Sequence, residues 1–270
     1  MQIPPGGTGS GYDSSQTSSQ VRGGWRFVLA PIEKLLFEIL QVLYGVVHDY
    51  GFAIILLTVA IRVLLLPLTI KQTRSMYELQ RIQPKIKELQ EKYKNDKEKL
   101  QEETLKFYQE NKVNPFGGCL PMLLQMPIFF ALFRMLGTTG DTVGLFPQHI
   151  ASVAAEQGQA AAEAVSRFWI ILPDITLSAS QVYSLNGLVA ALPYVIFVVL
   201  FGASTLVPQL MQPGAQSQQR QMGYVMAAMM LFFGWSVSAG VVLYWVTQGL
   251  LGVIQQIVQT KVYKAREVDA

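Results

Sequence analysis

Residues 51–70 read GFAIILLTVAIRVLLLPLTI, a stretch in which Arg62 is the single charged residue. A helix that crosses a bilayer needs about 20 mostly apolar residues, and its backbone polar groups must be satisfied within the segment. The stretch therefore predicts a membrane-spanning helix. The whole chain agrees: 51% of its 270 residues are hydrophobic and 14% are charged, with a mean hydropathy of +0.31. Soluble domains usually carry about 25% charged residues.

Other apolar segments raise the expected number of spans to five. They are residues 117–136, 188–211, 222–239 and 240–260 for the second to fifth spans. The last two come from one apolar region that is too long for a single crossing and is interrupted at residues 236–240 (SVSAG). Residues 25–263 would form the core, with loops at 137–187 and 212–221. The sequence predicts an all-α integral membrane protein.

The chain before the first span divides into two parts. Residues 1–24 are rich in Gly, Ser, Gln and Pro and contain no apolar run, which is typical of a disordered tail. Residues 25–50 contain an amphipathic pattern. Its apolar face would carry Leu35, Leu36, Ile39, Leu43, Val46 and Val47, and its polar face Glu33, Lys34, Glu38 and Gln41. Such a helix either lies in the membrane interface or packs against the bundle.

The charges of the loops predict the orientation, because cytosolic loops are enriched in Lys and Arg. Residues 71–114 contain eleven basic residues, whereas the loop 137–187 contains Arg167 alone against four acids. The short tail 261–270 is also basic. We therefore expect the N-terminus outside and the C-terminus in the cytosol, which an odd number of spans permits.

The basic segment 71–114 is expected to form a cytosolic hairpin of two helices. Apolar residues recur every three or four positions along 76–93, and Asn95-Asp96 is typical of a turn in which Asp96 caps the second helix. Pro84 is expected to kink the first helix. The basic charges either form a solvated face or attract anionic lipid headgroups or an RNA-rich partner such as the ribosome.

Arg62 lies nine residues before Lys71, so its Cα is roughly 14 Å from the cytosolic end of the span at about 1.5 Å per residue. An extended arginine side chain covers only part of that distance. A central arginine costs about 2.5–3.5 kcal/mol on insertion scales. We expect its charge to face protein or a water-filled cavity. A bend at Pro67 that brings water closer is the alternative.

Other polar side chains of the spans could line the same cavity. Thr58 lies one turn before Arg62 and shares its face, and Gln125 lies within the second span. The last two spans add Trp235, Tyr244, Trp245 and Gln248. Because Trp and Tyr are also common at membrane interfaces, the cluster rather than any single residue indicates an amphiphilic groove.

The sequence does not favour enzymatic chemistry. No carboxylate lies in the middle of an expected span, as proton-coupled transport or intramembrane aspartyl proteolysis would require. Neither His48 nor His149 lies deep in a span, and the single cysteine, Cys119, cannot form a disulfide within the chain. We expect no metal, cofactor or catalytic residue, and no binding of DNA.

Four segments together resemble the YidC-type membrane protein insertases, a family that includes the mitochondrial oxidase-assembly insertase and the thylakoid Albino protein. They are GFAIILLTVAIRVLLLPLT, QPKIKELQEKY, NPFGGCLPMLLQMPIFFALFRML and AGVVLYWVTQGLLGVIQQ. The resemblance extends over residues 31–263 and is most specific in 114–136. The short C-terminal tail, the long Ala-rich outer loop and the lack of a large outer domain before the first span depart from many members.

The resemblance implies an insertase and chaperone of the bacterial inner (plasma) membrane. It would insert and fold nascent membrane proteins, alone or with the Sec translocon, through a hydrophilic groove open to the cytosol and the lipid. By the same matching, Arg62 is the arginine of that groove, which would also include Thr58, Trp235, Tyr244 and Trp245. Gln125 falls in the matched second-span motif without an assigned role. The hairpin would be the cytosolic loop that meets the ribosome or the substrate.

Two other functional classes stay open from the sequence. A channel or small-solute transporter would need a continuous polar path and often has an inverted repeat, whereas the chain has no self-similar halves. A structural scaffold for another complex is the third class.

Overall fold

The computed structural model of the chain describes residues 14–111, 113, 120–139, 142–211 and 217–268. In chain order its elements are α1 (Ser14–Val47), α2 (Tyr50–Lys92), α3 (Lys97–Glu110), α4 (Leu120–Leu136), β1 (Thr138–Thr139), β2 (Thr142–Val143), α5 (Leu145–Gln157), α6 (Gln159–Ser166), α7 (Ala179–Leu210), α8 (Ser217–Ser236) and α9 (Ala239–Val268). Apart from the two-residue antiparallel pair of β1 and β2, the all-α prediction is confirmed.

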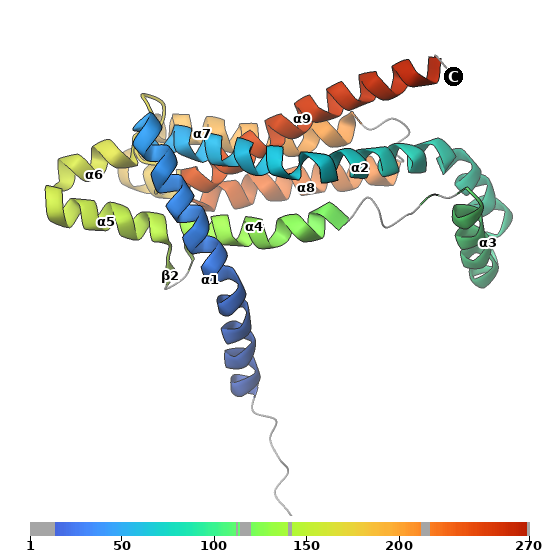
Figure 1. The fold of residues 1–270 in the computed structure, drawn as a ribbon, viewed down its shortest axis with the longest axis horizontal. Coiled ribbons are helices and arrows are strands. Elements are labelled where there is room, and N and C mark those ends of the chain that lie inside the picture. The colour runs from blue at the N-terminus through green and yellow to red at the C-terminus, as the bar shows by residue number, and fades with distance from the viewer. Residues whose placement is uncertain (1–13, 112, 114–119, 140–141, 212–216, 269–270) are drawn as a thin grey trace, which may run out of the picture.

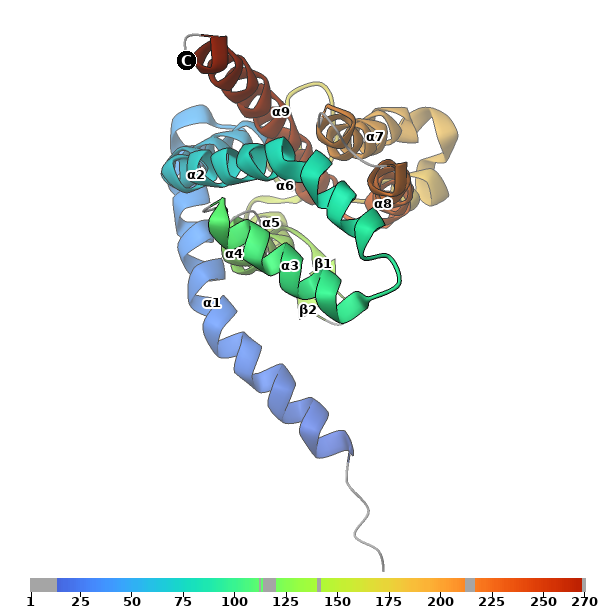
Figure 2. The same cartoon turned by 90° about the vertical axis from the view of Figure 1, so that its right-hand side faces the viewer.

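The long helices form a bundle that α1 crosses. Figure 1 shows α2, α4, α7, α8 and α9 running along the long axis, with α1 steeply inclined to them. Figure 2 looks along the bundle from the side of α3 and shows α9 between α2 and the pair formed by α7 and α8. This position of α9 brings its side chains against both α2 and α7.

Within the described part of the chain, three helical segments are long and apolar enough to cross a membrane: Tyr50–Ser75, Ala179–Leu210 and Ala239–Val262. Helices α4 and α8 occupy the expected second and fourth spans, and residues 117–119 and 212–216 beside them lie outside the described part of the chain. The count of five spans and the orientation therefore stay predictions. The expected break at residues 236–240 is confirmed, because α8 ends and α9 begins there.

Helix α1 is longer than the amphipathic pattern predicted. It begins at Ser14, so residues 14–24, which were expected in a disordered tail, are helical. Residues 1–13 of that tail lie outside the described part of the chain. Once a helix is nucleated by its packed part, each further residue is added at little cost, which explains why a polar composition did not stop it.

The buried face of α1 is rotated from the expected one, and the helix packs against the bundle. Leu36 and Leu40 are buried, whereas Leu35 is more than half exposed. Glu33, expected on the polar face, is nearly buried and forms an ion pair with Arg134 of α4, with Oε1 and Nε 3.0 Å apart. A charge pair that is this well covered ties α1 to α4 directly.

Helix α2 continues without a break from the expected first span into the hairpin. Its 43 residues include Pro67 and Pro84, and the predicted kink at Pro84 stays a prediction. Asp96 caps α3 as expected, since its carboxylate accepts a hydrogen bond from the N–H of Lys99 at 3.1 Å. Figure 1 shows α3 beside the end of α2, beyond the bundle. The predicted two-helix hairpin is confirmed.

Helix α7 is interrupted near its beginning. Gly187 has a φ of 79° and a ψ of −176°, a conformation that favours glycine. The first turns are fixed by Ser178, whose side chain forms a capping box with Gln181. The helix that follows Gly187 coincides with the third span expected at residues 188–211.

The bundle is packed more tightly at one end than at the other. We call the end with α5 and α6 the loop end and the end with α3 the hairpin end (Figure 1). Most of the completely buried side chains lie toward the loop end: Leu40, Tyr50, Ile54, Leu132, Met135, Leu136, Phe146, Leu172, Ile175 and Val241. Phe201 of α7 and Thr58 of α2, both 1% exposed, lie further along their helices. By contrast, no apolar side chain is buried in residues 59–70 of α2 or 247–262 of α9. The bundle is therefore closed at the loop end and looser toward the hairpin end.

Candidate functional site

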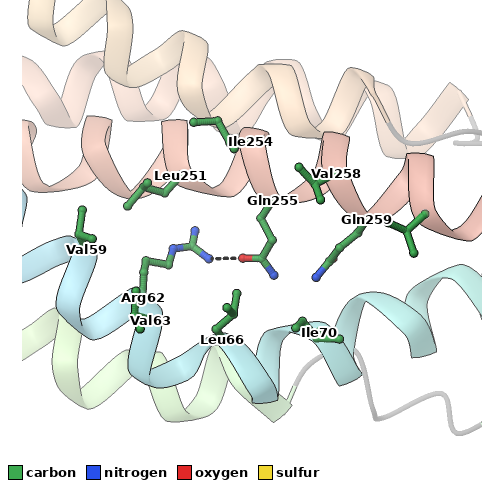
Figure 3. A pocket seen from close by; sticks show the side chains of 11 residues that line it. Val59, Arg62, Val63, Leu66, Ile70, Leu251, Ile254, Gln255, Val258 and Gln259 are labelled. Carbon is green, nitrogen blue, oxygen red and sulfur yellow. Dashed lines mark hydrogen bonds between the residues drawn. The ribbon is translucent and has the colours of Figure 1, made fainter.

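The guanidinium of Arg62 on α2 is held by two glutamines of α9. Its Nε donates to Oε1 of Gln248 at 3.0 Å, and its Nη2 donates to the main-chain carbonyl of Gln248 at 2.8 Å. Its Nη1 donates to Oε1 of Gln255 at 3.3 Å, the bond that Figure 3 draws across the space between the helices. The two glutamines lie about two helical turns apart and therefore face α2 together.

The charge of Arg62 has no counterion in the described part of the chain. All three acceptors are neutral, and the ion pairs recorded among the described residues do not include Arg62. Hydrogen bonds solvate a buried charge without neutralising it, and a guanidinium carries more N–H donors than these three bonds use. An anion that reached Arg62 would therefore find both an uncompensated charge and donors to bind.

Gly252 makes this contact possible. A side chain on a helix leans toward the N-terminus and covers the preceding turn, so a side chain at position 252 would lie over the carbonyl of Gln248. A Cβ added to Gly252 would lie 2.9 Å from Nη2 of Arg62. The glycine thus leaves the carbonyl accessible and gives the guanidinium its room.

A cavity of about 510 Å³ lies beside Arg62, between α2 and α9 and toward the hairpin end. Its polar side chains are Arg62, Gln255 and Gln259, and Figure 3 shows them in a row between apolar walls. The apolar lining consists of Val59, Val63, Leu66, Ile70, Leu251, Ile254, Val258 and Val262. Its volume is in the range of about 300–1,000 Å³ that is usual for ligand sites. The cavity can therefore accept an apolar segment that carries an anionic or polar group.

Three of the predicted residues lie between this cavity and the loop end. Tyr244, one turn before Gln248, is buried, and its hydroxyl accepts a hydrogen bond from Nε2 of Gln125 at 3.0 Å. This bond connects α4 to α9. Thr58, one turn before Arg62, is buried and donates to the main-chain carbonyl of Ile54 at 2.7 Å. Its hydroxyl is thus satisfied within its own helix.

The two predicted tryptophans lie away from Arg62. Trp235 is near the end of α8 and contacts the ring of Tyr183, with the ring centroids 5.9 Å apart. Trp245 lies between Phe129 of α4 and Phe201 of α7, with centroid distances of 5.1 and 5.3 Å. Neither tryptophan lines the cavity. Successive residues of a helix are rotated by about 100°, so Trp245 faces α4 and α7 rather than α2.

Three residues of α9 that build the site were not singled out from the sequence. Gly252, Gln255 and Gln259 follow Gln248 at spacings of four, seven and eleven, which places all four on one helix face. Gln259 is buried, and its Oε1 has no hydrogen-bond partner among the described residues. A stripe of amides and one glycine in an otherwise apolar helix was the signal that could have identified them.

Comparisons with known proteins agree with this architecture. Residues 42–266 match the family described as 60Kd inner membrane protein. The membrane protein insertase YidC of Endomicrobium trichonymphae is 36% identical over 224 residues, which are 83% of this chain and 38% of that protein. The YidC of Fusobacterium nucleatum is 35% identical over 211 residues, which are 78% of this chain and 85% of that protein.

A solved structure is also similar. It is described as an active YidC insertase crystal structure with the first transmembrane domain resolved. It shares 27% sequence identity and a TM-score of 0.57 with this chain, over 85% of this chain and 45% of the other. This chain thus spans less than half the length of that structure and of the Endomicrobium relative, and most of the length of the Fusobacterium relative. It belongs to the 60Kd inner membrane protein family, the family of the YidC membrane protein insertases.

Proposed function

We propose that this chain is a membrane protein insertase that places newly made membrane proteins in the bilayer and assists their folding. The observation that carries the proposal is the uncompensated charge of Arg62 in the wall of the cavity between α2 and α9. Family membership supports the same activity, since the similar proteins carry the name of insertases.

The physical task of an insertase is to move a polar segment through a hydrocarbon layer about 30 Å thick. A bundle that is packed at the loop end and loose toward the hairpin end shortens this barrier from one side. An acidic residue of the arriving segment would pair with Arg62. The pair is stronger there than in water, because the surroundings are less polar.

The apolar walls of the cavity would receive the apolar helix that adjoins the acidic segment. Val63 and Ile254 are more than half exposed, so the cavity wall continues into the lipid-facing surface of α2 and α9. Transfer of the substrate helix from water, by way of this wall, to lipid is favourable because it removes apolar surface from water, at about 25 cal/mol per Å². The chain itself would need no covalent chemistry and no nucleotide.

We infer that the hairpin end faces the cytosol and the loop end faces outside. The eleven basic residues of 71–114 support this orientation. Lys85, Lys87 and Lys92 of the hairpin are exposed, and such charges suit ribosomal RNA or anionic lipid. The ribosome and the Sec translocon are accordingly the partners to test first.

A channel or small-solute transporter is less well supported. Conduction requires a polar path through both ends of the bundle. The loop end is filled by apolar and aromatic side chains such as Tyr50, Ile54 and Leu136, each with an exposure of 1% or less. Ion flux through proteoliposomes that contain the purified chain would contradict this argument.

The test is complementation of a bacterial strain depleted of its own insertase. Arg62→Ala should impair insertion of small membrane proteins with acidic outer segments, and Arg62→Lys should retain most of the activity because it keeps the charge. Arg74→Ala is the matched control, since Arg74 lies further along the same helix and is paired on the surface with Glu78. Full insertion by Arg62→Ala would remove Arg62 from the mechanism, and failure of the unmodified chain to complement would remove the function.

A further inference from the structure

The segment between α6 and α7 contains a tight turn whose tip is apolar. Phe168 and Leu172 form its base: they pair as an isolated antiparallel bridge and are 5% and 0% exposed. The three residues between them point outward, with exposures of 57% for Trp169, 81% for Ile170 and 37% for Ile171. A turn with a buried base and three consecutive exposed apolar residues is unusual for a surface in water, where tips are commonly polar.

The turn is held in a costly backbone conformation. Trp169 has a φ of 45°, a region that bulky residues rarely adopt. The N–H of Trp169 donates to Oδ2 of Asp49 at 2.7 Å, while Oδ1 of Asp49 caps α2 through the N–H of Phe52. One carboxylate thus fixes both the turn and the first residues of the membrane-spanning helix. Strain of this kind persists where the surrounding structure imposes it and often marks a functional segment.

The exposed tip continues the lipid-facing surface of α2. Phe52 contacts the rings of Phe168 and Trp169, with centroid distances of 5.3 and 6.4 Å. Phe52 and Leu56, one turn apart on α2, are each 40% exposed. Because the apolar segment of α2 that is long enough to cross a membrane begins at Tyr50, the tip would lie at the level where the helix meets the interface.

The charge beside the turn fits this location. Arg167 precedes the turn, is exposed and is the single basic residue of the loop 137–187. Tryptophan is enriched where lipid headgroups meet hydrocarbon, and arginine beside such a position pairs with lipid phosphates. Along the turn, the charged Arg167 comes first, then the ring of Trp169, then the aliphatic Ile170 and Ile171. A lipid leaflet changes in the same order, from charged headgroups through the interface to acyl chains.

We propose that residues 167–172 form an anchor in the lipid leaflet at the loop end, and that Asp49 couples this anchor to α2. The anchor would set how deeply α2 sits. Arg62 lies 13 residues after Asp49, or about 20 Å along the helix. Lys71 lies 22 residues after Asp49, or about 33 Å along the helix. With the anchor at one boundary of a hydrocarbon core about 30 Å thick, Lys71 reaches the other boundary and Arg62 stays inside. This inference needs α2 to span the membrane but does not need the proposed insertase activity.

The test measures depth with spin labels on the full chain in phosphatidylethanolamine and phosphatidylglycerol vesicles. In a Cys119→Ser background, Ile170→Cys carries the label at the tip. Two further positions calibrate the scale: Gln157→Cys, exposed at the end of α5, and Leu64→Cys, 77% exposed on α2. Collisions with oxygen report lipid, and collisions with a water-soluble nickel complex report water. The label at position 170 should favour oxygen several-fold over the label at position 157.

A second measurement tests the coupling. Ile170→Asp should shift the oxygen-to-nickel ratio of the label at position 64, because the helix is no longer held at the same depth. Val143→Asp is the control, since Val143 is exposed in the same loop but outside the turn. A tip label as accessible to nickel as the label at position 157, or as shielded from both reagents as a buried site, would overturn the anchor. An unchanged ratio at position 64 in Ile170→Asp would overturn its role in setting depth.

Discussion

Gly252→Ala tests whether the glycine serves Arg62. The new Cβ would lie 2.9 Å from Nη2 of Arg62, which is closer than an ordinary van der Waals contact. The guanidinium must then shift away from α9, and we expect this shift to break its 2.8 Å bond to the carbonyl of Gln248. The same substitution removes a flexible residue from the interior of a helix, which by itself favours the folded state.

Two free-energy terms of opposite sign decide the outcome. Loss of a hydrogen bond from a charged group costs about 1.5–3 kcal/mol, whereas alanine in place of glycine in a helix gains about 0.5–1 kcal/mol. The net effect is a destabilisation of roughly 0.5–2.5 kcal/mol by these values. In an Arg62→Lys background the side chain has no Nη2, so only the gain remains. Gly252→Ala should then stabilise the protein by up to about 1 kcal/mol.

Unfolding in mixed detergent micelles measures both differences as a double-mutant cycle. Gly45→Ala is the matched control, because nothing lies within 4 Å of a Cβ at Gly45, and it should stabilise both backgrounds equally. Insertion of a substrate with an acidic tail, measured in proteoliposomes, should fall with Gly252→Ala only when Arg62 is present. If Gly252→Ala changes the free energy of unfolding by the same amount and sign in both backgrounds, the role assigned to the glycine is refuted.

Three further results are expected. Gln255→Glu places a carboxylate against the guanidinium of Arg62, so insertion of substrates with acidic tails should fall. Gln256→Glu is the control: Gln256 faces α7, so the charge of Arg62 should stay uncompensated and insertion should be higher than in Gln255→Glu. Equal losses of insertion in the two variants would contradict this. Glu33→Gln breaks the ion pair with Arg134. The contribution of this pair to stability lies between the roughly 1 kcal/mol of exposed pairs and the roughly 3–5 kcal/mol lost when a buried pair is broken, so hydrogen exchange in α1 should become faster. Unchanged exchange would mean that the pair does not hold α1 in place. Burial lowers the pKa of His149, and Glu156 opposes this only in part, so protonation of His149 destabilises the folded state. The melting temperature should therefore fall as the pH drops below the ordinary histidine pKa of 6.5, and it should fall less in His149→Phe. Equal pH profiles of the two proteins would exclude His149 as the cause.

Features encoded by short stretches of sequence were predicted correctly. The first span follows from one apolar run, and the break near residue 236 follows from the excess length of another. Asp96 was identified as a helix cap because its carboxylate can accept a hydrogen bond from an unpaired N–H of the first helical turn, two or three residues further along the chain. The position of Arg62 along its helix also follows from counting residues, whereas its depth in a membrane stays a prediction.

Features that depend on how helices face each other could not be predicted. Gln248 and Gln255 meet Arg62 across 186 and 193 residues of sequence, and nothing local fixes the rotation of α9 against α2. For the same reason the contact of Trp235 with Tyr183 was not foreseen, and the buried face of α1 is rotated from the expected one. In a membrane protein apolar residues face both lipid and protein, so hydrophobic periodicity identifies a helix without saying which side is packed.

The continuity of α2 has a mechanical consequence. The helix runs unbroken from Tyr50 to Lys92, so Arg62 lies about 18 Å and Lys92 about 63 Å from its start when measured along the helix at about 1.5 Å per residue. If the helix tilts as one piece about its fixed beginning, Arg62 moves sideways by about three tenths of the distance that Lys92 moves. A displacement of α3, such as one caused by a bound partner, would therefore move the guanidinium in the same direction by a smaller distance. Docking of a partner at the hairpin would then be coupled to the position of the Arg62 guanidinium.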